Sequence, residues 1–309
     1  MDVLSAVGIC ALVLWSYDTF KSLVGICWGL CKQQWTVGCD YVQRYGKWAV
    51  ITGGSDGIGR QYAMFFARQG LNIVIIAMPD EKLAKTVQEI EEKFKVQVRS
   101  IPVDFSKAYE VYNYLKEKIA DLEIGVLVNN VGTGQCYATY FEADSIDGHQ
   151  RVVNVNINAV VMMSHIVLPQ MKQRLRGLVI NISSAFGLTP VPTVLIYGAS
   201  KAFMLSFSLA MREELRPFGV ECQTVTPYFV KTTLTGQFAM TKLGWLVCAN
   251  LESFTKFLTM TIGKTAQTTG YWVHGWHVTI VKLLPTDLVC RMYHLLGKFR
   301  INENKLKGK

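Results

Sequence analysis

The sequence predicts an α/β domain in which helices cover a parallel sheet on both faces. Short runs that are apolar at nearly every position alternate with longer stretches of helical periodicity, from Lys47 to about residue 227. A glycine-rich turn follows the first of these runs. Strands that are buried on both faces form such continuous apolar runs, whereas half-exposed strands alternate. Since no repeat or long linker divides the chain, we predict one doubly wound domain over about residues 46–290.

The predicted strands and helices follow one another in strict order. The strands are expected at 47–54, 71–77, 98–105, 124–130, 177–183 and 220–227. The helices are expected up to Arg68 after the first strand and then at 81–94, 108–119, 153–171 and 196–215. In the second helix, Leu83, Val87, Ile90 and Phe94 recur on one face, which is typical of a helix packed on a sheet.

The amino-terminal residues are apolar. The runs Val3–Trp15 and Ser22–Cys31 are separated by a short segment that holds Asp18 and Lys21. Neither run alone reaches the roughly 18–20 residues that cross a bilayer. We predict an uncleaved membrane anchor over residues 1–35, either as one helix or as a shallow hairpin. A helix buried against the protein itself is the alternative.

The other end of the chain is basic. KLKGK places Lys305 and Lys307 five and three positions from the end, a spacing that resembles the dilysine retrieval signal of endoplasmic-reticulum membrane proteins. We therefore predict a basic tail over 291–309, an endoplasmic-reticulum membrane location and a main domain that faces the cytosol. The eight cysteines form no C-x-x-C pair, which favours a reducing compartment.

Composition limits the partners. The net charge of +9 suits an anionic membrane or a phosphorylated ligand. No basic run interleaved with aromatic residues is present, so we predict no nucleic-acid partner. The five histidines and the cysteines lack the spacing of metal ligands, and we predict no metal site.

The segment TGGSDGIG, Thr52–Gly59, lies between the first predicted strand and the first helix. Gly53 permits a tight turn, Gly57 lets the backbone approach a phosphate, and Gly59 lets the helix pack closely on the strand. The helix amino terminus that follows favours an anion. The segment predicts a dinucleotide phosphate site, and a glycine-rich turn without a ligand is the alternative.

The form T-G-x-x-x-G-x-G resembles the cofactor loop of the short-chain dehydrogenase/reductase family, whose domain has a Rossmann-type fold. Asp104 of PVDF resembles the adenine-contacting aspartate of the family, and NNVG at 129–132 resembles its motif after the fourth strand. The resemblance covers about residues 47–235. The cofactor-binding residues that it implies are Thr52, Gly53, Ser55, Asp56, Gly57, Ile58, Gly59, Asp104, Asn130, Gly132, Tyr197, Lys201, Pro227 and Thr232.

A tyrosine stands four residues before a lysine at Tyr17, Tyr112, Tyr114 and Tyr197. The family places a serine thirteen residues before its catalytic tyrosine, and only Tyr197 has one, Ser184. By resemblance the catalytic residues are Asn156, Ser184, Tyr197 and Lys201, and Ser184 and Tyr197 also contact the substrate. Asn154 and Asn158 are alternatives for the asparagine.

These residue types suit carbonyl reduction. A hydride that reaches a carbonyl carbon leaves negative charge on the oxygen, which then needs a proton. A lysine cation one helical turn from Tyr197 is expected to lower the tyrosine pKa from about 10. Ser184 can donate a hydrogen bond to the substrate oxygen. By resemblance, Lys201 also holds the nicotinamide ribose and Asn156 positions a water in a proton relay.

The choice of cofactor is expected to depend on IIAMPDEKL, after the second strand. An acid there binds the ribose of NAD, and a base binds the 2′-phosphate of NADP. Ala77 and Met78 occupy these positions, and Asp80 is a candidate helix cap. We predict NADPH because the acid is missing, and NADH stays open because the base is missing too.

Further segments, among them LVINISS and TTGYWVHG, resemble the membrane-bound 17β-hydroxysteroid dehydrogenases, very-long-chain 3-oxoacyl-CoA reductases and hydroxysteroid dehydrogenase-like proteins. This implies reduction of a ketone on a lipid, either a 3-oxoacyl-CoA or a 17-ketosteroid. The region of about 230–290 is expected to bind the substrate, and its amphipathic stretches suit a membrane surface or, equally, core packing and a homodimer face. The alternative function is a non-catalytic lipid- or cofactor-binding scaffold.

Overall fold

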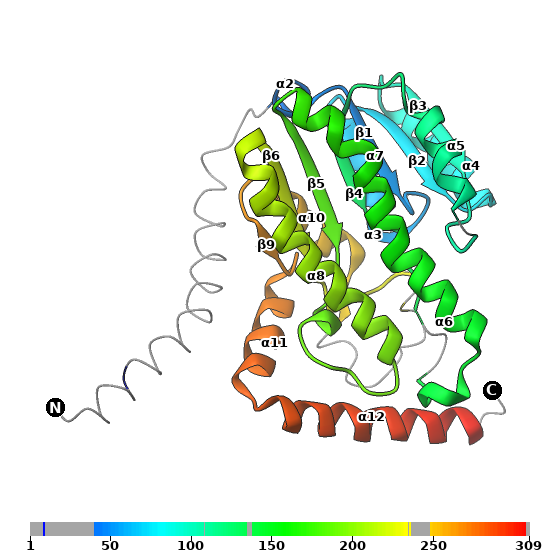
Figure 1. Cartoon of the computed structure of the whole chain (residues 1–309), viewed down its shortest axis with the longest axis vertical. Coiled ribbons are helices and arrows are strands. Elements are labelled where there is room, and N and C mark those ends of the chain that lie inside the picture. Colours follow the sequence, from blue (N-terminus) through cyan, green and yellow to red (C-terminus); the bar gives the residue numbers. More distant parts are fainter. Residues whose placement is uncertain are drawn as a thin grey trace.

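The computed structural model describes residues 40–107, 109–134, 138–233, 235 and 248–306, together with Ile9. Apart from Ile9, the predicted anchor over 1–35 lies outside these residues, so neither of its two forms is tested. The described part forms one layered α/β body (Figure 1).

The central sheet has seven parallel strands in the order β3-β2-β1-β4-β5-β6-β9. They are β1 (Trp48–Thr52), β2 (Asn72–Ala77), β3 (Val98–Pro102), β4 (Ile124–Asn129), β5 (Gly177–Ile182), β6 (Val220–Val225) and β9 (Gln267–Thr268). The first six confirm the predicted strands. The sequence did not indicate β9, because this strand has only two residues, which pair with Thr224 and Val225. The strand order reverses at β1, which is where doubly wound folds bind their ligands.

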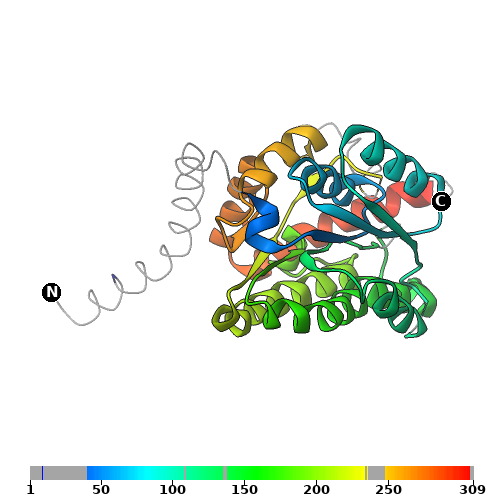
Figure 2. The same cartoon turned by 90° about the horizontal axis from the view of Figure 1, so that it is seen from above.

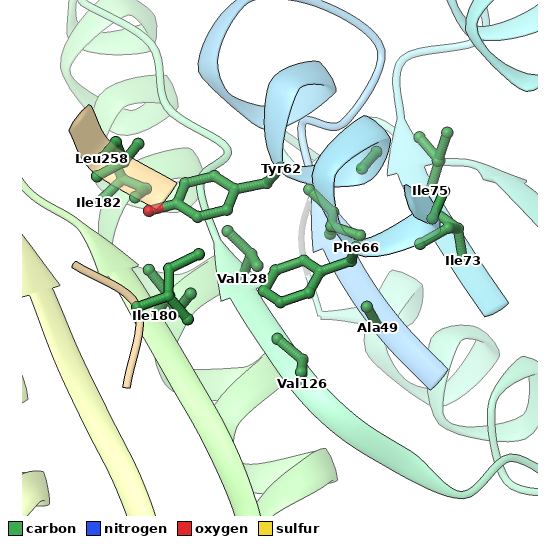
Figure 3. Close-up of a cluster of buried hydrophobic side chains, with 14 of the residues drawn as sticks. Ala49, Tyr62, Phe66, Ile73, Ile75, Val126, Val128, Ile180, Ile182 and Leu258 are labelled. Carbon is green, nitrogen blue, oxygen red and sulfur yellow. The ribbon is translucent and has the colours of Figure 1, made fainter. Parts of the chain in front are cut away.

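Helices cover both faces of the sheet (Figure 2). On one face lie α3 (Gly57–Arg68), α4 (Glu81–Lys93) and α10 (Leu251–Met260); on the other lie α5 (Glu110–Lys118), α7 (Ala159–Gln173) and α8 (Leu195–Leu215). Within β1, Ala49 and Ile51 belong to the core on the first face and Val50 to the core on the second. Figure 3 shows Tyr62 and Phe66 of α3 packed on the first face.

Side-chain caps fix where two of these helices begin. Asp56 accepts a hydrogen bond of 2.7 Å from the backbone N–H of Gly57 at the start of α3. Asp80 accepts one of 3.0 Å from the N–H of Leu83 at the start of α4. Both bonds satisfy donors that a helix end leaves unpaired. The predicted capping role of Asp80 is confirmed.

The helix α7 continues α6 (Ile146–Val153) through a π-helical turn, η3 (Asn154–Asn158). In the described residues, the stretch Ile146–Gln173 is the one helix whose length and composition would allow it to cross a membrane. Met163 and Val167 are fully buried in the core beneath the sheet. Packing in the core therefore accounts for part of the apolar character of this helix.

Smaller elements complete the structure. They are α2 (Tyr41–Tyr45), η2 (Phe141–Ala143), η4 (Ala185–Gly187), η5 (Arg216–Phe218), β7 (Phe229–Val230), β8 (Cys248–Ala249), α11 (Trp272–Leu283) and α12 (Thr286–Leu306). α12 lies along one outer edge of the body (Figure 1). It includes residues 291–306 of the predicted basic tail, while the dilysine-like signal extends beyond the described residues.

Candidate active site

The carboxyl ends of β1 and β4 are tied together by hydrogen bonds. The Thr52 hydroxyl oxygen accepts from the backbone N–H of Asn130 at 3.0 Å and of Val131 at 3.1 Å. In return, the Asn130 side-chain amide donates to the carbonyl oxygens of Thr52 and Gly53, both at 3.0 Å. Thr52 and Asn130, two predicted cofactor residues, thus hold the glycine-rich loop in place.

Within the loop, the glycines are required by geometry. Gly53 and Gly57 have φ angles of +64° and +55°, which side chains strongly disfavour. A Cβ at Gly59 would collide with the carbonyl oxygen of Gly53, so only glycine lets α3 start so close to β1. Thr232 lies against this loop, since its methyl carbon is 3.2 Å from the position of a Cβ at Gly57. The bare backbone and the helix amino terminus fit a dinucleotide phosphate.

Other predicted cofactor residues also lie at the carboxyl edge of the sheet. Gly132 lies between two catalytic candidates, because a Cβ there would be 3.4 Å from Nζ of Lys201 and 3.6 Å from Oδ1 of Asn156. Asp104 follows β3 and accepts from the N–H of Ser106 at 2.9 Å.

Three further predicted cofactor residues, Ser55, Ile58 and Pro227, are fixed in place by hydrogen bonds or by packing. The carbonyl oxygen of Ser55 accepts from the Thr86 hydroxyl at 2.9 Å, and Ile58 packs on the core. The carbonyl oxygen of Pro227 accepts from the N–H of Ala185 at 2.8 Å. Each of these predicted residues therefore has a defined place, and their contact with a cofactor stays a prediction.

The structure brings Ser184 and Tyr197 together across the end of β5. Ser184 lies two residues after the end of β5, is buried, and forms a side-chain hydrogen bond with Tyr197 on α8. The Ser184 hydroxyl also accepts from the N–H of Phe186 at 3.2 Å and lies 3.4 Å from the carbonyl oxygen of Pro227. The two hydroxyls that the sequence pairs by their thirteen-residue spacing are therefore neighbours in space.

The electrostatics of Tyr197 differ from the prediction. Burial raises the tyrosine pKa, and the hydrogen bond from Ser184 only partly opposes this. The predicted lowering by Lys201 is not found, because the lysine nitrogen lies 5.8 Å from the centroid of the tyrosine ring and is directed elsewhere. Tyr197 therefore keeps its proton at neutral pH, as a proton donor requires.

Lys201 is almost completely buried. Its ammonium donates a hydrogen bond of 2.9 Å to the carbonyl oxygen of Ile182, at the end of β5. Burial lowers its pKa to about 8, since desolvation disfavours the charged form. The group therefore changes charge close to physiological pH.

Asn156 is the asparagine that faces the site. It is fully buried in the π-helical turn. Its amide donates to the carbonyl oxygen of Thr133 and to the Ser200 hydroxyl, both at 2.9 Å, and its oxygen accepts from the N–H of Thr133 at 2.8 Å. By contrast, Asn158 donates to Asn154 at 2.9 Å. This geometry favours Asn156 over its two neighbours, and its water-positioning role stays a prediction.

The sequence reasoning missed Lys82. Its ammonium lies 2.7 Å from a carboxylate oxygen of Asp56 and 3.2 Å from the Thr233 hydroxyl, so it stands beside the glycine-rich loop. Met78, which occupies the usual basic position, is half-exposed. Lys82 stands four residues farther along the same segment, in the first turn of α4, and its place in IIAMPDEKL could have indicated it.

A pocket that is open to solvent adjoins the Ser184 side of the site. Its lining residues are Ala185, Leu188, Thr189, Tyr228, His277, Val278, Val281, Lys282 and Tyr293. Tyr228 hydrogen-bonds to Tyr293 and stacks on His277, with ring centroids 5.4 Å apart. An apolar pocket with a few polar groups is typical of a small-molecule site. Four of its residues, His277, Val278, Val281 and Lys282, come from the predicted substrate region of about 230–290, within α11, whereas Tyr293 lies beyond that region on α12.

His274 has a structural role next to this pocket. Its Nδ1 accepts from the backbone N–H of Tyr228 at 3.3 Å, and its Nε2 lies 3.1 Å from the carbonyl oxygen of Phe229. The ring therefore fixes the backbone that follows Pro227.

A glycine-rich dinucleotide cradle beside a Ser-Tyr-Lys cluster defines a class of protein, the nicotinamide-dependent oxidoreductases that act on alcohols and ketones. The family model described as short chain dehydrogenase matches residues 47–242, close to the predicted extent of 47–235. The chain belongs to the short-chain dehydrogenase/reductase family, and it is an oxidoreductase of the kind that acts on CH–OH groups.

Comparison with known proteins gives two kinds of relative. The chain is 41% identical over 255 residues to the very-long-chain 3-oxoacyl-CoA reductase of Homo sapiens, covering 82% of this chain and 80% of the relative. It is 36% identical over 247 residues to the inactive hydroxysteroid dehydrogenase-like protein 1 of Homo sapiens, covering 80% and 74%.

A solved structure is similar as well. It is a short-chain dehydrogenase from Sphingobium yanoikuyae in complex with NADPH, 26% identical, with a TM-score of 0.66. The match covers 72% of this chain and 86% of that one. The fold of the described domain is therefore that of a dinucleotide-binding dehydrogenase.

Proposed function

We propose that this protein is a membrane-bound, NADPH-dependent reductase that converts a ketone on a lipid substrate to the alcohol. The observation that carries the proposal is the cluster of buried Ser184 and Lys201 with partly buried Tyr197, which stands between the dinucleotide cradle and an apolar pocket. The relative named a very-long-chain 3-oxoacyl-CoA reductase supports a lipid substrate.

The dinucleotide, when bound, supplies the hydride. The residues of the chain orient the substrate and supply the proton. Ser184 orients the substrate carbonyl by donating a hydrogen bond to its oxygen. Tyr197, whose pKa burial raises, holds a proton at its hydroxyl next to that oxygen. By resemblance to the family, Lys201, whose nitrogen lies 5.8 Å from the centroid of the tyrosine ring, holds the nicotinamide ribose.

Lys82 supports the preference for NADPH. The ribose 2′-phosphate of NADPH needs a cation beyond the second strand, and Met78 cannot provide one. The Lys82 ammonium, held between Asp56 and Thr233, supplies a positive charge at the loop. We therefore assign NADPH as the cofactor and Lys82 as the residue that recognises its extra phosphate.

Two substrate classes remain candidates, a 3-oxoacyl-CoA and a 17-ketosteroid. Both present a ketone within a long apolar body. Lys282 in the pocket lining and the net charge of +9 favour the acyl-CoA, whose phosphates are anionic. Together with the anchor and the basic tail predicted from the sequence, this supports a place at the endoplasmic-reticulum membrane with the domain in the cytosol.

The test is turnover by the full chain in a membrane fraction. NADPH and NADH oxidation are followed separately, with a long-chain 3-oxoacyl-CoA and with a 17-ketosteroid. We expect faster turnover with NADPH and with the acyl-CoA. A steroid preference would reassign the substrate. Tight dinucleotide binding without turnover on either substrate would instead indicate the non-catalytic scaffold, as the name of one relative suggests for that protein.

A further inference from the structure

The outer face of α12 is an apolar stripe. Leu288, Met292, Leu295 and Phe299 are 45%, 48%, 66% and 68% exposed. Their spacing of four, three and four residues places them on one side of the helix. Leu296, 61% exposed, widens the stripe. We call these residues the α12 stripe. A surface helix normally presents polar residues to water, so the stripe requires an apolar partner.

The opposite face of α12 is packed on the body. Val289 and Ile301 are buried. A Cβ at Gly297 would collide with the Thr193 side chain, so the helix lies directly on the loop that precedes α8. The α12 stripe therefore cannot be buried by turning the helix, because the packed face would then be exposed.

Cations lie beside the stripe. Arg291 and Lys298 are exposed and lie seven residues apart, two turns of the same helix. Among the side chains described for α12, through Asn302, the sequence has one acid, Asp287. An apolar stripe flanked by cations is complementary to the acyl chains and anionic headgroups of a bilayer. In a symmetric contact between two copies, the same cations would meet one another.

A second exposed stripe runs along the preceding helix. Trp272, Trp276, Ile280 and Leu283 of α11 are 49%, 52%, 55% and 41% exposed and recur at helical spacing. Tryptophan is enriched where proteins meet the membrane–water interface. Leu283 ends α11 just before α12 begins, so the two stripes are adjacent along the chain.

The same helix reaches the substrate pocket. Tyr293 of α12 lines the pocket and hydrogen-bonds to Tyr228, and its ring lies 5.9 Å from that of Phe186. A helix with its side chains is about 10 Å across. The pocket is therefore separated from the α12 stripe by about the thickness of one helix.

We propose that the α12 stripe lies in the interfacial layer of an anionic bilayer and that the pocket takes its substrate from that surface. The proposed docking of α12 on the bilayer rests only on its exposed residues. The delivery of a lipid ketone rests on the proposed function.

The first test measures contact with lipid. The full chain, with a photoreactive benzoylphenylalanine at Phe299 or, as a control, at Tyr114 of α5, is reconstituted in vesicles of phosphatidylcholine and phosphatidylserine with radiolabelled acyl chains. The two proteins differ only in the position of the photoreactive residue, so both are held on the vesicle in the same way. We expect roughly tenfold more label on the Phe299 protein, since burial of one large apolar side chain changes partitioning by about that factor. Equal labelling overturns the proposal, and so does a crosslinked dimer at Phe299 without lipid label.

The second test separates docking from catalysis. In Leu295→Ser/Phe299→Ser, the proposal predicts a several-fold higher KM for a long-chain ketone in the vesicles, with unchanged kcat for a short, water-soluble ketone. The control variant replaces Tyr114 with Ser. An unchanged KM in the double variant would overturn the proposed entry of substrate from the membrane surface. Absence of turnover in the unaltered chain would overturn only the proposed function, because the lipid-labelling test does not depend on turnover.

Discussion

The ammonium of Lys201 donates a hydrogen bond of 2.9 Å to the carbonyl oxygen of Ile182, the last residue of β5. The strand thereby holds the cation beneath the Tyr197 ring, at 5.8 Å from its centroid. The nitrogen is buried, and its pKa falls to about 8. The backbone carbonyl thus fixes the position of the lysine, while burial sets the pH range in which it is charged.

This arrangement predicts a pH limit for reduction. The charge on Lys201 is present below pH 8 and is lost as the pH rises through about 8, while Tyr197, whose pKa is raised, still holds its proton. We expect kcat/KM for ketone reduction to fall above pH about 8. In Lys201→Arg, whose guanidinium stays charged, the remaining activity should not show that fall. A profile of the unaltered enzyme that is flat to high pH would contradict the assignment.

Removal of one hydroxyl tests the proton donor. Tyr197→Phe keeps the ring and removes the group that hydrogen-bonds with Ser184. Loss of a general acid typically lowers the rate about 10²–10⁴-fold. We expect turnover to fall by that factor while the Kd for the dinucleotide changes little. Tyr114→Phe is the matched control, since Tyr114 also stands four residues before a lysine. Full activity in Tyr197→Phe would show that another group gives the proton.

The buried asparagine can be tested through stability. Asn156→Leu leaves the N–H and carbonyl of Thr133 without their side-chain partner. Each unsatisfied buried group costs about 1–3 kcal/mol, so we expect a loss of about 2–4 kcal/mol in the free energy of unfolding, measured by thermal unfolding. In Asn158→Leu only a bond to the neighbouring Asn154 is lost, and a clearly smaller effect is expected. Equal losses of unfolding free energy in the two variants would contradict the special role that the structure gives to Asn156 over Asn158.

Lys82 should determine cofactor preference. Lys82→Met keeps most of the side-chain volume and removes the charge beside Asp56. Since a charge-assisted hydrogen bond contributes about 1.5–3 kcal/mol, we expect KM for NADPH to rise roughly tenfold or more, with a small change for NADH. Lys85→Met is the control, because Lys85 pairs with Glu81 on the same helix. A parallel rise for both dinucleotides would show that Lys82 only supports the loop.

Much of the fold could be predicted because it depends on local patterns. Apolar runs such as NIVIIA and IGVLVN became strands that are buried nearly throughout. The glycines of the loop also have local causes, in their φ angles and in the lack of room for a Cβ. β9 escaped prediction because its two residues have no pattern of their own and are held only by pairing with β6.

The candidate site was predictable in its residue types but not in its electrostatics. Spacing and motif order selected Ser184 and Tyr197, and the structure places their hydroxyls together. The prediction of a lowered tyrosine pKa was wrong, because sequence spacing does not reveal that burial dominates or that Lys201 is directed to Ile182. Lys82 was missed for a related reason, since its partner Asp56 is 26 residues away in the chain.

By itself the sequence determined the order of the first six strands of the sheet and of the helices between them, the dinucleotide loop and the residues that define the family, because these depend on periodicity and on short motifs. Only the tertiary structure decided which groups are desolvated and which segments meet. It brought Tyr293, far along the chain, to the pocket beside Ser184 and left the outer face of α12 exposed. Burial and long-range contact are properties of the packed chain, and they fix both the charge of Lys201 and the surface that we propose for the bilayer.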